Sequence, residues 1–185
     1  PIVDGTELSD HEIAEVLKVL IGSEGRVQCL DLPERRLWIK RQGVKVLPPL
    51  VSIQGGLAAL LRIPFLRPSP QLAPEAMQAR EVARMAAFAE AGFAVPRILY
   101  ASKTAMVMAD VGPTLQQTLK EMRGDDPARH DALLIKAARQ LGRVHAAGLS
   151  HGRPHVRDFF LRDGEVGFMD FEEDLRFLAK VVVHG

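Results

Sequence analysis

The segment from His151 to Glu172 constrains the fold of this chain most. A polar loop that begins at His151 is followed, one short hairpin later, by the tripeptide Asp170-Phe171-Glu172. The apolar run over residues 166–169 that precedes Asp170 has the character of a buried strand. A carboxylate at the end of such a strand is costly unless a cation or hydrogen-bond donors meet it. We therefore expect Asp170 to belong to a cation site; an Asp that only caps a turn is the alternative.

Capping and breaking residues predict four helices and a few strands. Ser9 and Glu12 form a capping-box pattern before the first helix, and Pro74 and Gly92 frame the second. The helices are expected over about 10–20, 74–90, 114–122 and 128–147. Strands are expected over 26–29, 36–40 and 105–108, the first two joined by a turn at 31–34. Strands followed by mostly helical chain with one hairpin indicate an α+β fold in two lobes.

Length and charge exclude several kinds of protein. A chain of 185 residues suits one domain or a compact two-lobed fold. The balance of 24 Lys and Arg against 23 Asp and Glu gives no bulk charge that would favour nucleic acid. The single cysteine, Cys29, excludes an internal disulfide framework and fits a reducing compartment. The opening residues also show no signal-peptide pattern, so we expect a cytoplasmic protein.

Four features follow one another in the order typical of protein kinases. Lys40 ends a strand, Glu81 lies in the next helix, a strand breaks at 109–111, and the unit from His151 to Asp170 follows. Over roughly residues 26–173 the chain resembles the protein-kinase-like superfamily. Its short N-terminal lobe, the helix and turn over 81–99 and the His-Gly-x-Pro loop are most similar to bacterial lipopolysaccharide core kinases, which phosphorylate heptose or Kdo sugars.

The resemblance implies a division into two lobes. A small β-rich N-lobe would cover residues 1–108, and a hinge with a reduced, mainly helical C-lobe would cover 109–185. The N-lobe carries an apolar insert at 44–70 that a minimal kinase lobe lacks. Prolines and Arg62 interrupt its most apolar part, 47–66, which argues against a spanning helix. A helix on a membrane surface, a helix packed on its own domain and a partner interface remain open.

The resemblance also implies how ATP would bind. Lys40 would contact the α- and β-phosphates and be held in place by Glu81, and the backbone of Ala109 and Val111 would bind the adenine edge. Two alternatives remain for the first pair. Lys40 can be a solvated lysine at a strand end, and a shift of one helical turn would bring another acid, or none, to Lys40.

The loop after His151 departs from the family pattern. Asp170 and Asp158 fall on magnesium-binding positions, and His151 falls on the histidine that braces the loop. Arg153 falls on the position of the Asp that accepts the proton of the substrate hydroxyl. Because a guanidinium stays protonated, Arg153 can act only electrostatically or structurally. Asp158 or His155 remains as a candidate base, although a loop histidine such as His155 is more often merely exposed.

The family's glycine-rich phosphate loop has only a weak counterpart, at residues 22–25. The resemblance nevertheless implies an atypical phosphotransferase that uses ATP and magnesium and acts on a sugar hydroxyl of lipopolysaccharide or a similar glycolipid. Such a protein would work in the cytoplasm, at the inner membrane surface. The alternative is a catalytically impaired pseudokinase that binds a nucleotide or a regulatory partner. The choice between enzyme and pseudokinase depends on Arg153.

Overall fold

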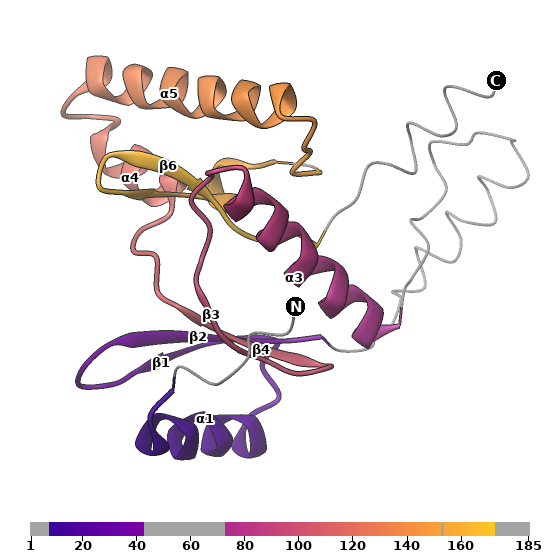
Figure 1. The fold of residues 1–185 in the computed structure, drawn as a ribbon. Coiled ribbons are helices and arrows are strands. Elements are labelled where there is room, and N and C mark those ends of the chain that lie inside the picture. The colour runs from indigo at the N-terminus through magenta and orange to yellow at the C-terminus, as the bar shows by residue number, and fades with distance from the viewer. Residues whose placement is uncertain (1–7, 43–72, 153, 173–185) are drawn as a thin grey trace, which may run out of the picture.

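The computed structural model describes residues 8–42, 73–152 and 154–172. The predictions for the insert at 44–70, for Arg153 and for the residues after 172 lie outside these ranges. The described residues form an α+β fold in which helices pack on small antiparallel sheets, as the sequence predicts (Figure 1).

Four antiparallel strands form the sheet of the first lobe, in the order β1-β2-β4-β3. Their bounds are Val27–Asp31 for β1, Arg36–Arg41 for β2, Ile98–Ala101 for β3 and Ala105–Ala109 for β4. The predicted hairpin and the predicted strand at 105–108 are confirmed, whereas β3 is a strand that sequence analysis did not predict. Helix α1, Asp10–Gly22, lies along one face of this sheet (Figure 1). β4 ends one residue after the expected lobe boundary at 108.

Helices and one hairpin make up most of the other described residues. The helices are α3 (Pro74–Glu90), α4 (Leu115–Met122), α5 (Pro127–Ala146) and the 3₁₀ turn η2 (Val156–Asp158), and the hairpin is β5 (Phe159–Arg162) with β6 (Glu165–Phe168). Thr114 and Asp126 accept backbone N–H bonds at the first turns of α4 and α5, which explains why both helices begin where the sequence predicts. α3 runs obliquely from the sheet toward the hairpin (Figure 1).

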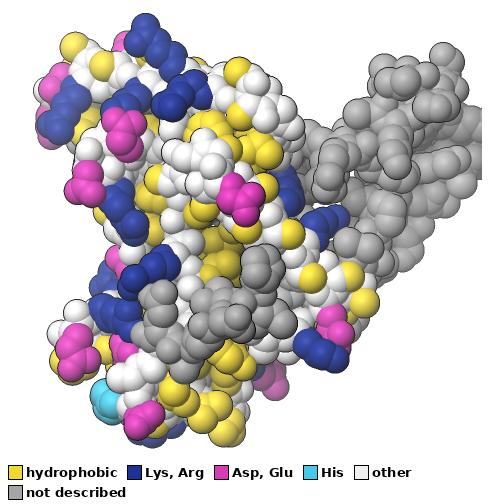
Figure 2. Space-filling model, in the orientation of Figure 1, with side chains coloured by type: hydrophobic (Ala, Val, Ile, Leu, Met, Phe, Trp, Pro, Cys, Tyr) yellow, Lys and Arg dark blue, Asp and Glu magenta, His cyan; other side chains and the backbone are white. Residues whose placement is uncertain are grey.

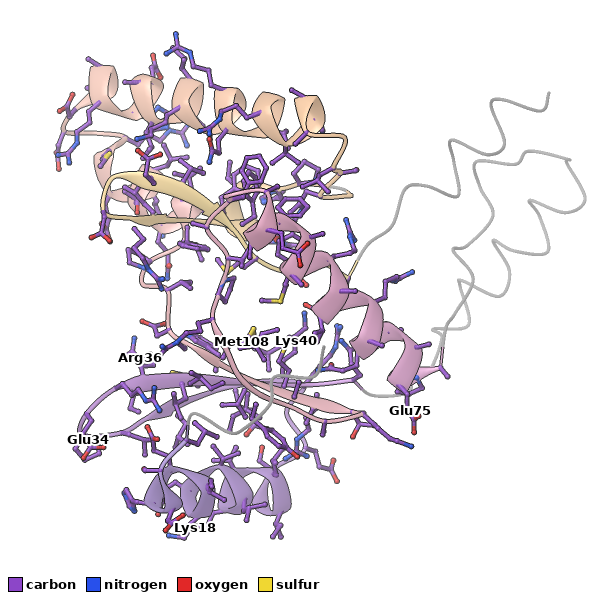
Figure 3. All side chains as sticks on the ribbon, viewed as in Figure 1. Lys18, Glu34, Arg36, Lys40, Glu75 and Met108 are labelled. Carbon is purple, nitrogen blue, oxygen red and sulfur yellow. The ribbon has the colours of Figure 1, made fainter. Side chains whose placement is uncertain are left out.

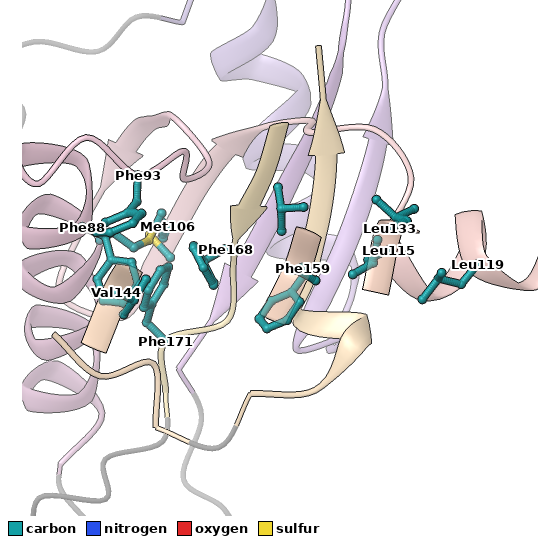
Figure 4. Close-up of a cluster of buried hydrophobic side chains, with 13 residues drawn as sticks. Phe88, Phe93, Met106, Leu115, Leu119, Leu133, Val144, Phe159, Phe168 and Phe171 are labelled. Atoms are coloured by element: carbon teal, nitrogen blue, oxygen red, sulfur yellow. The ribbon is translucent and has the colours of Figure 1, made fainter. Parts of the chain in front are cut away.

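The two faces of the sheet belong to two different hydrophobic cores. Leu37, Ile39 and Val107 pack against α1, whereas Met106 joins the core that α3 forms with the second lobe. Figure 4 shows this second core, in which phenylalanine rings from α3 and from the segment after β6 meet. Because successive side chains of a strand point to opposite faces, Lys40 lies on the face turned away from α1. Its register partner on β4 is Met106.

A buried acid fixes the start of α1. Glu12 is 4% exposed, and its carboxylate accepts a 2.7 Å bond from the Ser9 N–H together with bonds of 2.6 and 2.8 Å from the Arg35 guanidinium. The Arg35 hydrogen bond lowers the pKa of Glu12 from 4.5 to about 2, against the opposing effect of burial. The pair ties α1 to the β1–β2 turn.

We expect the ion pair of Glu12 and Arg35 to make the free energy of unfolding depend on pH in the acidic range. Since the folded-state pKa of Glu12 lies below its ordinary value, its contribution to stability is present above pH 4.5 and is lost as pH falls toward 2. Urea unfolding should show a deficit for Glu12→Gln at pH 7 that shrinks by roughly half at pH 3. Glu15→Gln, which removes the more exposed pair with Lys18, serves as the control. An equal deficit at both pH values would contradict this assignment.

Gly167 is expected to tolerate no side chain. It faces Phe160 across the β5–β6 hairpin, and a Cβ at Gly167 would lie 2.2 Å from the Phe160 ring, which is fully buried. Because the ring has no free space to move into, Gly167→Ala should destabilise the fold by about 1–3 kcal/mol. Gly124→Ala, where a Cβ meets nothing, is the control. Thermal unfolding measures both, and equal midpoints for the two variants would refute this packing.

Candidate functional site

Lys40 and Glu81 form a buried ion pair. The Lys40 Nζ lies 2.6 Å from the Glu81 Oε1, and the two side chains are 7% and 2% exposed. The other carboxylate oxygen of Glu81 accepts a 3.0 Å bond from the Gln42 Nε2. The predicted contact is therefore confirmed, and Lys40 is not a solvated lysine. Glu75, another acid of α3, lies in the first turn of the helix and pairs with Lys103 (Figure 3).

Two further carboxylates and one more cation complete this group, which we call the Lys40 cluster. The Lys40 Nζ lies 3.0 Å from the Asp170 Oδ1 and 2.8 Å from the Glu172 Oε1. The Arg26 guanidinium forms an ion pair with the same Glu172 oxygen. Glu81, Asp170 and Glu172 each offer an oxygen within 4.8 Å of the others. The cluster thus joins β2, α3, the residue before β1 and the segment after β6.

The charges of the cluster support one another. Burial alone would lower the pKa of Lys40, but the carboxylates of Glu81, Asp170 and Glu172 outweigh burial and raise it. Burial likewise opposes ionisation of Glu172, yet Lys40 and Arg26 hold the pKa of Glu172 below its usual range. Burial raises the pKa of Glu81, and the Lys40 ammonium opposes that rise. Lys40 and Glu172 are therefore charged at neutral pH.

Asp170 occupies a turn rather than a strand end. β6 ends at Phe168, and Asp170 has a left-handed backbone with φ of 61° and a side chain that is 52% exposed. The expectation of an acid at the end of a buried strand is therefore wrong, and burial is not what requires a cation here. A left-handed conformation is uncommon for a residue with a side chain and is found at sites where the surrounding structure imposes it. The turn leaves the half-exposed carboxylate in contact with Lys40.

Two arginines of α3 hold the segment 170–172 by its backbone. The Arg84 guanidinium donates to the carbonyls of Phe171 at 2.8 Å and Ser150 at 2.5 Å, and Arg80 donates to the carbonyl of Glu172 at 2.7 Å. Phe171 is fully buried and packs its ring against Phe88, with centroids 4.7 Å apart. Glu81, which shares α3 with these residues, is thereby fixed relative to Asp170. Sequence analysis missed both arginines, because only the fold brings them to these carbonyls.

His151 braces the loop as the resemblance implies. It is 2% exposed, and its Nε2 lies 2.9 Å from the Met169 carbonyl, an acceptor, so Nε2 carries the proton. Burial lowers the pKa of His151, in keeping with a neutral ring. The Nδ1 is buried without a hydrogen-bond partner. His151 therefore contributes to the position of Met169 and, through it, of Asp170.

A backbone hydrogen bond ties the loop that carries Asp158 to the segment that carries Asp170. The Met169 N–H donates to the Asp158 carbonyl at 2.8 Å, which links the two segments. The Asp158 carboxylate is 10% exposed and accepts a 2.9 Å bond from the His155 N–H. His155 itself is exposed, and its Nδ1 accepts from the Arg157 N–H at 3.3 Å. Arg153 lies outside the described residues, so its predicted role remains a prediction.

The hinge after β4 is tied to both lobes. The Trp38 Nε1 donates to the Asp110 carboxylate at 2.6 Å, and the Arg162 guanidinium donates to the Asp110 carbonyl at 3.1 Å. The Ala109 N–H donates to the Arg97 carbonyl at 2.9 Å, so a contact from Ala109 to a base would use the Ala109 carbonyl. The predicted adenine contacts of Ala109 and Val111 remain predictions.

The glycine segment at 22–25 differs from a phosphate loop between two strands. Gly22 ends α1, and the Gly25 N–H donates to the Ser23 hydroxyl at 3.3 Å. A Cβ at Gly25 would lie 2.6 Å from the Gln28 side chain, so the segment folds onto β1. Within the described ranges, the only turn ahead of Lys40 that joins two strands is 32–35, and it contains no glycine.

Comparison with known proteins identifies the family. Residues 69–178 match the sequence profile of the lipopolysaccharide kinase (Kdo/WaaP) family. The chain belongs to this family. The match covers α3, the segment after β4, the loop after His151 and Asp170, and it bears out the resemblance to kinase-like proteins.

Two relatives of this Kdo/WaaP-family chain are similar to it over only part of their length. A Haemophilus influenzae protein with the name "Uncharacterized protein" is 36% identical over 84 residues, which are 45% of this chain and 34% of that protein. The structure of Rv3197 from Mycobacterium tuberculosis, in complex with erythromycin, is similar over 80% of this chain and 42% of that one. The TM-score is 0.51 at 20% identity, a similarity that concerns the fold alone. The chain thus spans less than half of either relative.

Proposed function

We propose that this Kdo/WaaP-family protein is a phosphotransferase that uses ATP and magnesium and acts on a sugar hydroxyl of lipopolysaccharide or a similar glycolipid. The observation that carries the proposal is the buried Lys40, paired with Glu81 at 2.6 Å and with Asp170 at 3.0 Å. A lysine fixed between a helix acid and an acid of the hairpin segment is the arrangement with which kinase-like proteins hold nucleotide phosphates. Membership of the family supports the acceptor class.

The residues present fit a nucleotide with magnesium. Lys40 supplies a permanent cation for the α- and β-phosphates, and Glu81 fixes its position. Asp170 offers a half-exposed carboxylate, the hard oxygen ligand that magnesium prefers, and Asp158 is the second proposed ligand. Bound magnesium would supply neutralisation of charge on the transferred phosphoryl group. The backbone of Ala109 and Val111 would receive the adenine.

In the proposed mechanism, the usual base is absent at the step that removes the proton from the acceptor hydroxyl. Arg153 is proposed as the residue at the position of the usual base, where its guanidinium can bind an anion but cannot take a proton. Asp158, whose loop His151 braces, is the residue proposed to accept the proton instead. General-base help contributes roughly 10²–10⁴ in rate, so its loss leaves slow transfer. The proposal therefore includes a low turnover.

The acceptor places the protein at a membrane surface in the cytoplasm. A glycolipid acceptor presents its sugar at the membrane boundary, and the apolar segment 47–66 is the proposed contact with that surface. None of the helices over the described ranges combines the length and the apolar character that crossing a bilayer requires. The proposed division remains an N-lobe over 1–108 and a hinge with C-lobe over 109–185.

Asp170→Asn is expected to remove magnesium-dependent nucleotide binding while the fold persists. Asn tolerates the left-handed backbone of residue 170, so the change removes a charge and adds little strain. ATP with magnesium at ~100 times Kd should raise the Tm of the wild-type protein by about 5–10 °C, and most of this shift should vanish in the variant. Asp125→Asn, in an exposed loop, is the control. An unchanged shift in Asp170→Asn would reject the metal role.

A pseudokinase remains the second candidate, because Arg153 stands where a base is expected. In that case the protein would bind nucleotide through Lys40 and Asp170 but would transfer no phosphoryl group. Turnover of ATP with a lipopolysaccharide core acceptor separates the two functions. Transfer above the uncatalysed rate that disappears in Asp170→Asn supports the enzyme. Nucleotide binding without any such transfer supports the pseudokinase.

A further inference from the structure

The Glu172 carboxylate lies where two cations converge. Its Oε1 is 2.8 Å from the Lys40 Nζ and forms an ion pair with the Arg26 guanidinium. The Glu172 side chain is only 13% exposed, although it is not one of the residues of the hydrophobic core. One oxygen shared by an ammonium and a guanidinium is the coordination that a phosphate oxygen receives in protein sites. The Glu172 oxygen therefore marks an anion position beside Lys40.

Arg26 is built into this position by the sheet. Its carbonyl accepts a 2.7 Å bond from the Arg41 N–H, one residue after Lys40 on β2. The following residue, Val27, is the register partner of Lys40 in the β1–β2 pair. The base of the Arg26 side chain is thus fixed to the strand that carries Lys40. Its guanidinium is 41% exposed, so it remains accessible from solvent.

The glycine segment 22–25 is less suited than Arg26 to donate hydrogen bonds to a phosphate group. The Gly25 N–H already donates to the Ser23 hydroxyl, and the Gly25 carbonyl accepts from Gln28. The backbone N–H and carbonyl of Gly25 are therefore directed to neighbouring side chains. The segment ends, however, at Arg26, which points a cation into the Lys40 cluster. A guanidinium with five donors in a planar fork can replace several backbone N–H groups as a phosphate ligand.

Glu172 is able to leave this position without a change of the backbone. Its carbonyl accepts a 2.7 Å bond from Arg80, and the neighbouring Phe171 is held by Arg84 and by its buried ring. Rotation of the Glu172 side chain alone would free the shared oxygen position. The segment 170–172 would keep Asp170 in place while the carboxylate moves.

We propose that Arg26 and Lys40 together bind a phosphate group of a nucleoside polyphosphate, and that the Glu172 carboxylate occupies this position when no phosphate is bound. The inference rests on the proposed function and adds to it a second phosphate-binding cation and an internal competitor. Because a ligand has to displace the competitor, its apparent affinity is reduced by the fraction of molecules in which Glu172 holds the two cations.

Binding of three probes by calorimetry tests the proposal: ATP, inorganic triphosphate and adenosine. Arg26→Gln should weaken ATP and triphosphate by about 10-fold, whereas Glu172→Gln, which keeps the shape and removes the charge, should tighten both by about 3–10-fold. Adenosine has no phosphate and should bind all variants alike. Arg36→Gln removes an exposed arginine of the same hairpin, paired with Asp31, and should change nothing. Thermal unfolding of each variant confirms that it is folded.

The outcomes separate this inference from the proposed function. Equal triphosphate affinity in wild type, Arg26→Gln and Glu172→Gln, together with a loss in Lys40→Met, would overturn the role of Arg26 and leave the nucleotide site intact. Failure of both wild type and Glu172→Gln to bind ATP or triphosphate would overturn the proposed function and the inference together. Binding in Glu172→Gln where the wild type shows none would support the internal competitor.

Discussion

Lys40→Met is expected to weaken ATP binding by about 10–100-fold, the loss that follows when a hydrogen bond from a cation to a charged ligand is removed. Methionine keeps the apolar stem of the side chain and removes only the ammonium. The Lys40 ammonium contacts the carboxylates of Glu81, Asp170 and Glu172. Without it, these three negative charges lie close together and lack the cation that neutralises them. The measurement is calorimetric titration with ATP and magnesium. The control is Lys103→Met, at an exposed lysine of the β3–β4 turn that pairs with Glu75.

The same substitution should destabilise the fold by about 3–5 kcal/mol, because the Glu81 carboxylate would stay buried and hydrogen-bonded to Gln42 but would lose its cation. Adding Glu81→Leu should recover most of this loss without restoring ATP binding. The double variant therefore separates stability from ligand binding. Wild-type ATP affinity in a folded Lys40→Met or in the double variant would remove Lys40 from the site.

Phe88→Ala is expected to cost about 3–5 kcal/mol, the range for truncating a buried aromatic ring. Phe88 is 1% exposed, and its ring meets those of Phe93, Phe168 and Phe171 at centroid distances of 5.7, 5.6 and 4.7 Å. The ring joins α3 to the segment that carries Asp170, so its loss should also weaken nucleotide binding. Urea unfolding gives the stability change.

Two variants control for this effect. Phe88→Leu fills most of the same volume and should lose less than half as much stability. Leu134→Ala, on the exposed side of α5, should cost well under 1 kcal/mol. Similar losses in Phe88→Ala and Leu134→Ala would show that the ring cluster of Figure 4 does not hold α3 in place.

Local sequence signals account for most of the fold. The capping box of Ser9 and Glu12 and the proline at Pro74 predict helix starts that agree with the structure, and the helix expected from residue 114 begins one residue later. Lys40 and Glu81 are brought together as expected, because a strand followed by a crossing helix leaves little choice of partner. β3 escaped prediction because it is only four residues long and follows a proline-containing turn.

The parts of the site that sequence analysis missed depend on contacts between distant segments. Arg26 and Glu172 are 146 residues apart, and no local pattern marks them as partners. In the sequence, Arg80 and Arg84 have the character of surface residues of an amphipathic helix. Only the fold brings the carbonyls of Glu172 and Phe171 beside them. The turn at Asp170 was hidden because the apolar run before it is compatible with a longer strand.

The two lobes meet where the space-filling surface narrows, with Lys and Arg side chains on both sides of the waist (Figure 2). In the proposed function, a nucleotide bound at the Lys40 cluster would bring its metal next to Asp170. Mn²⁺, a paramagnetic substitute for magnesium, reports that position directly through the loss of nearby amide signals in NMR spectra. Addition of ATP with Mn²⁺ should broaden the signals of Lys40, Asp170 and their neighbours, and leave those of Asp10 in α1 and Ala128 in α5 sharp. Broadening centred on another part of the molecule, or the same weak broadening with and without ATP, would contradict a nucleotide site at Lys40.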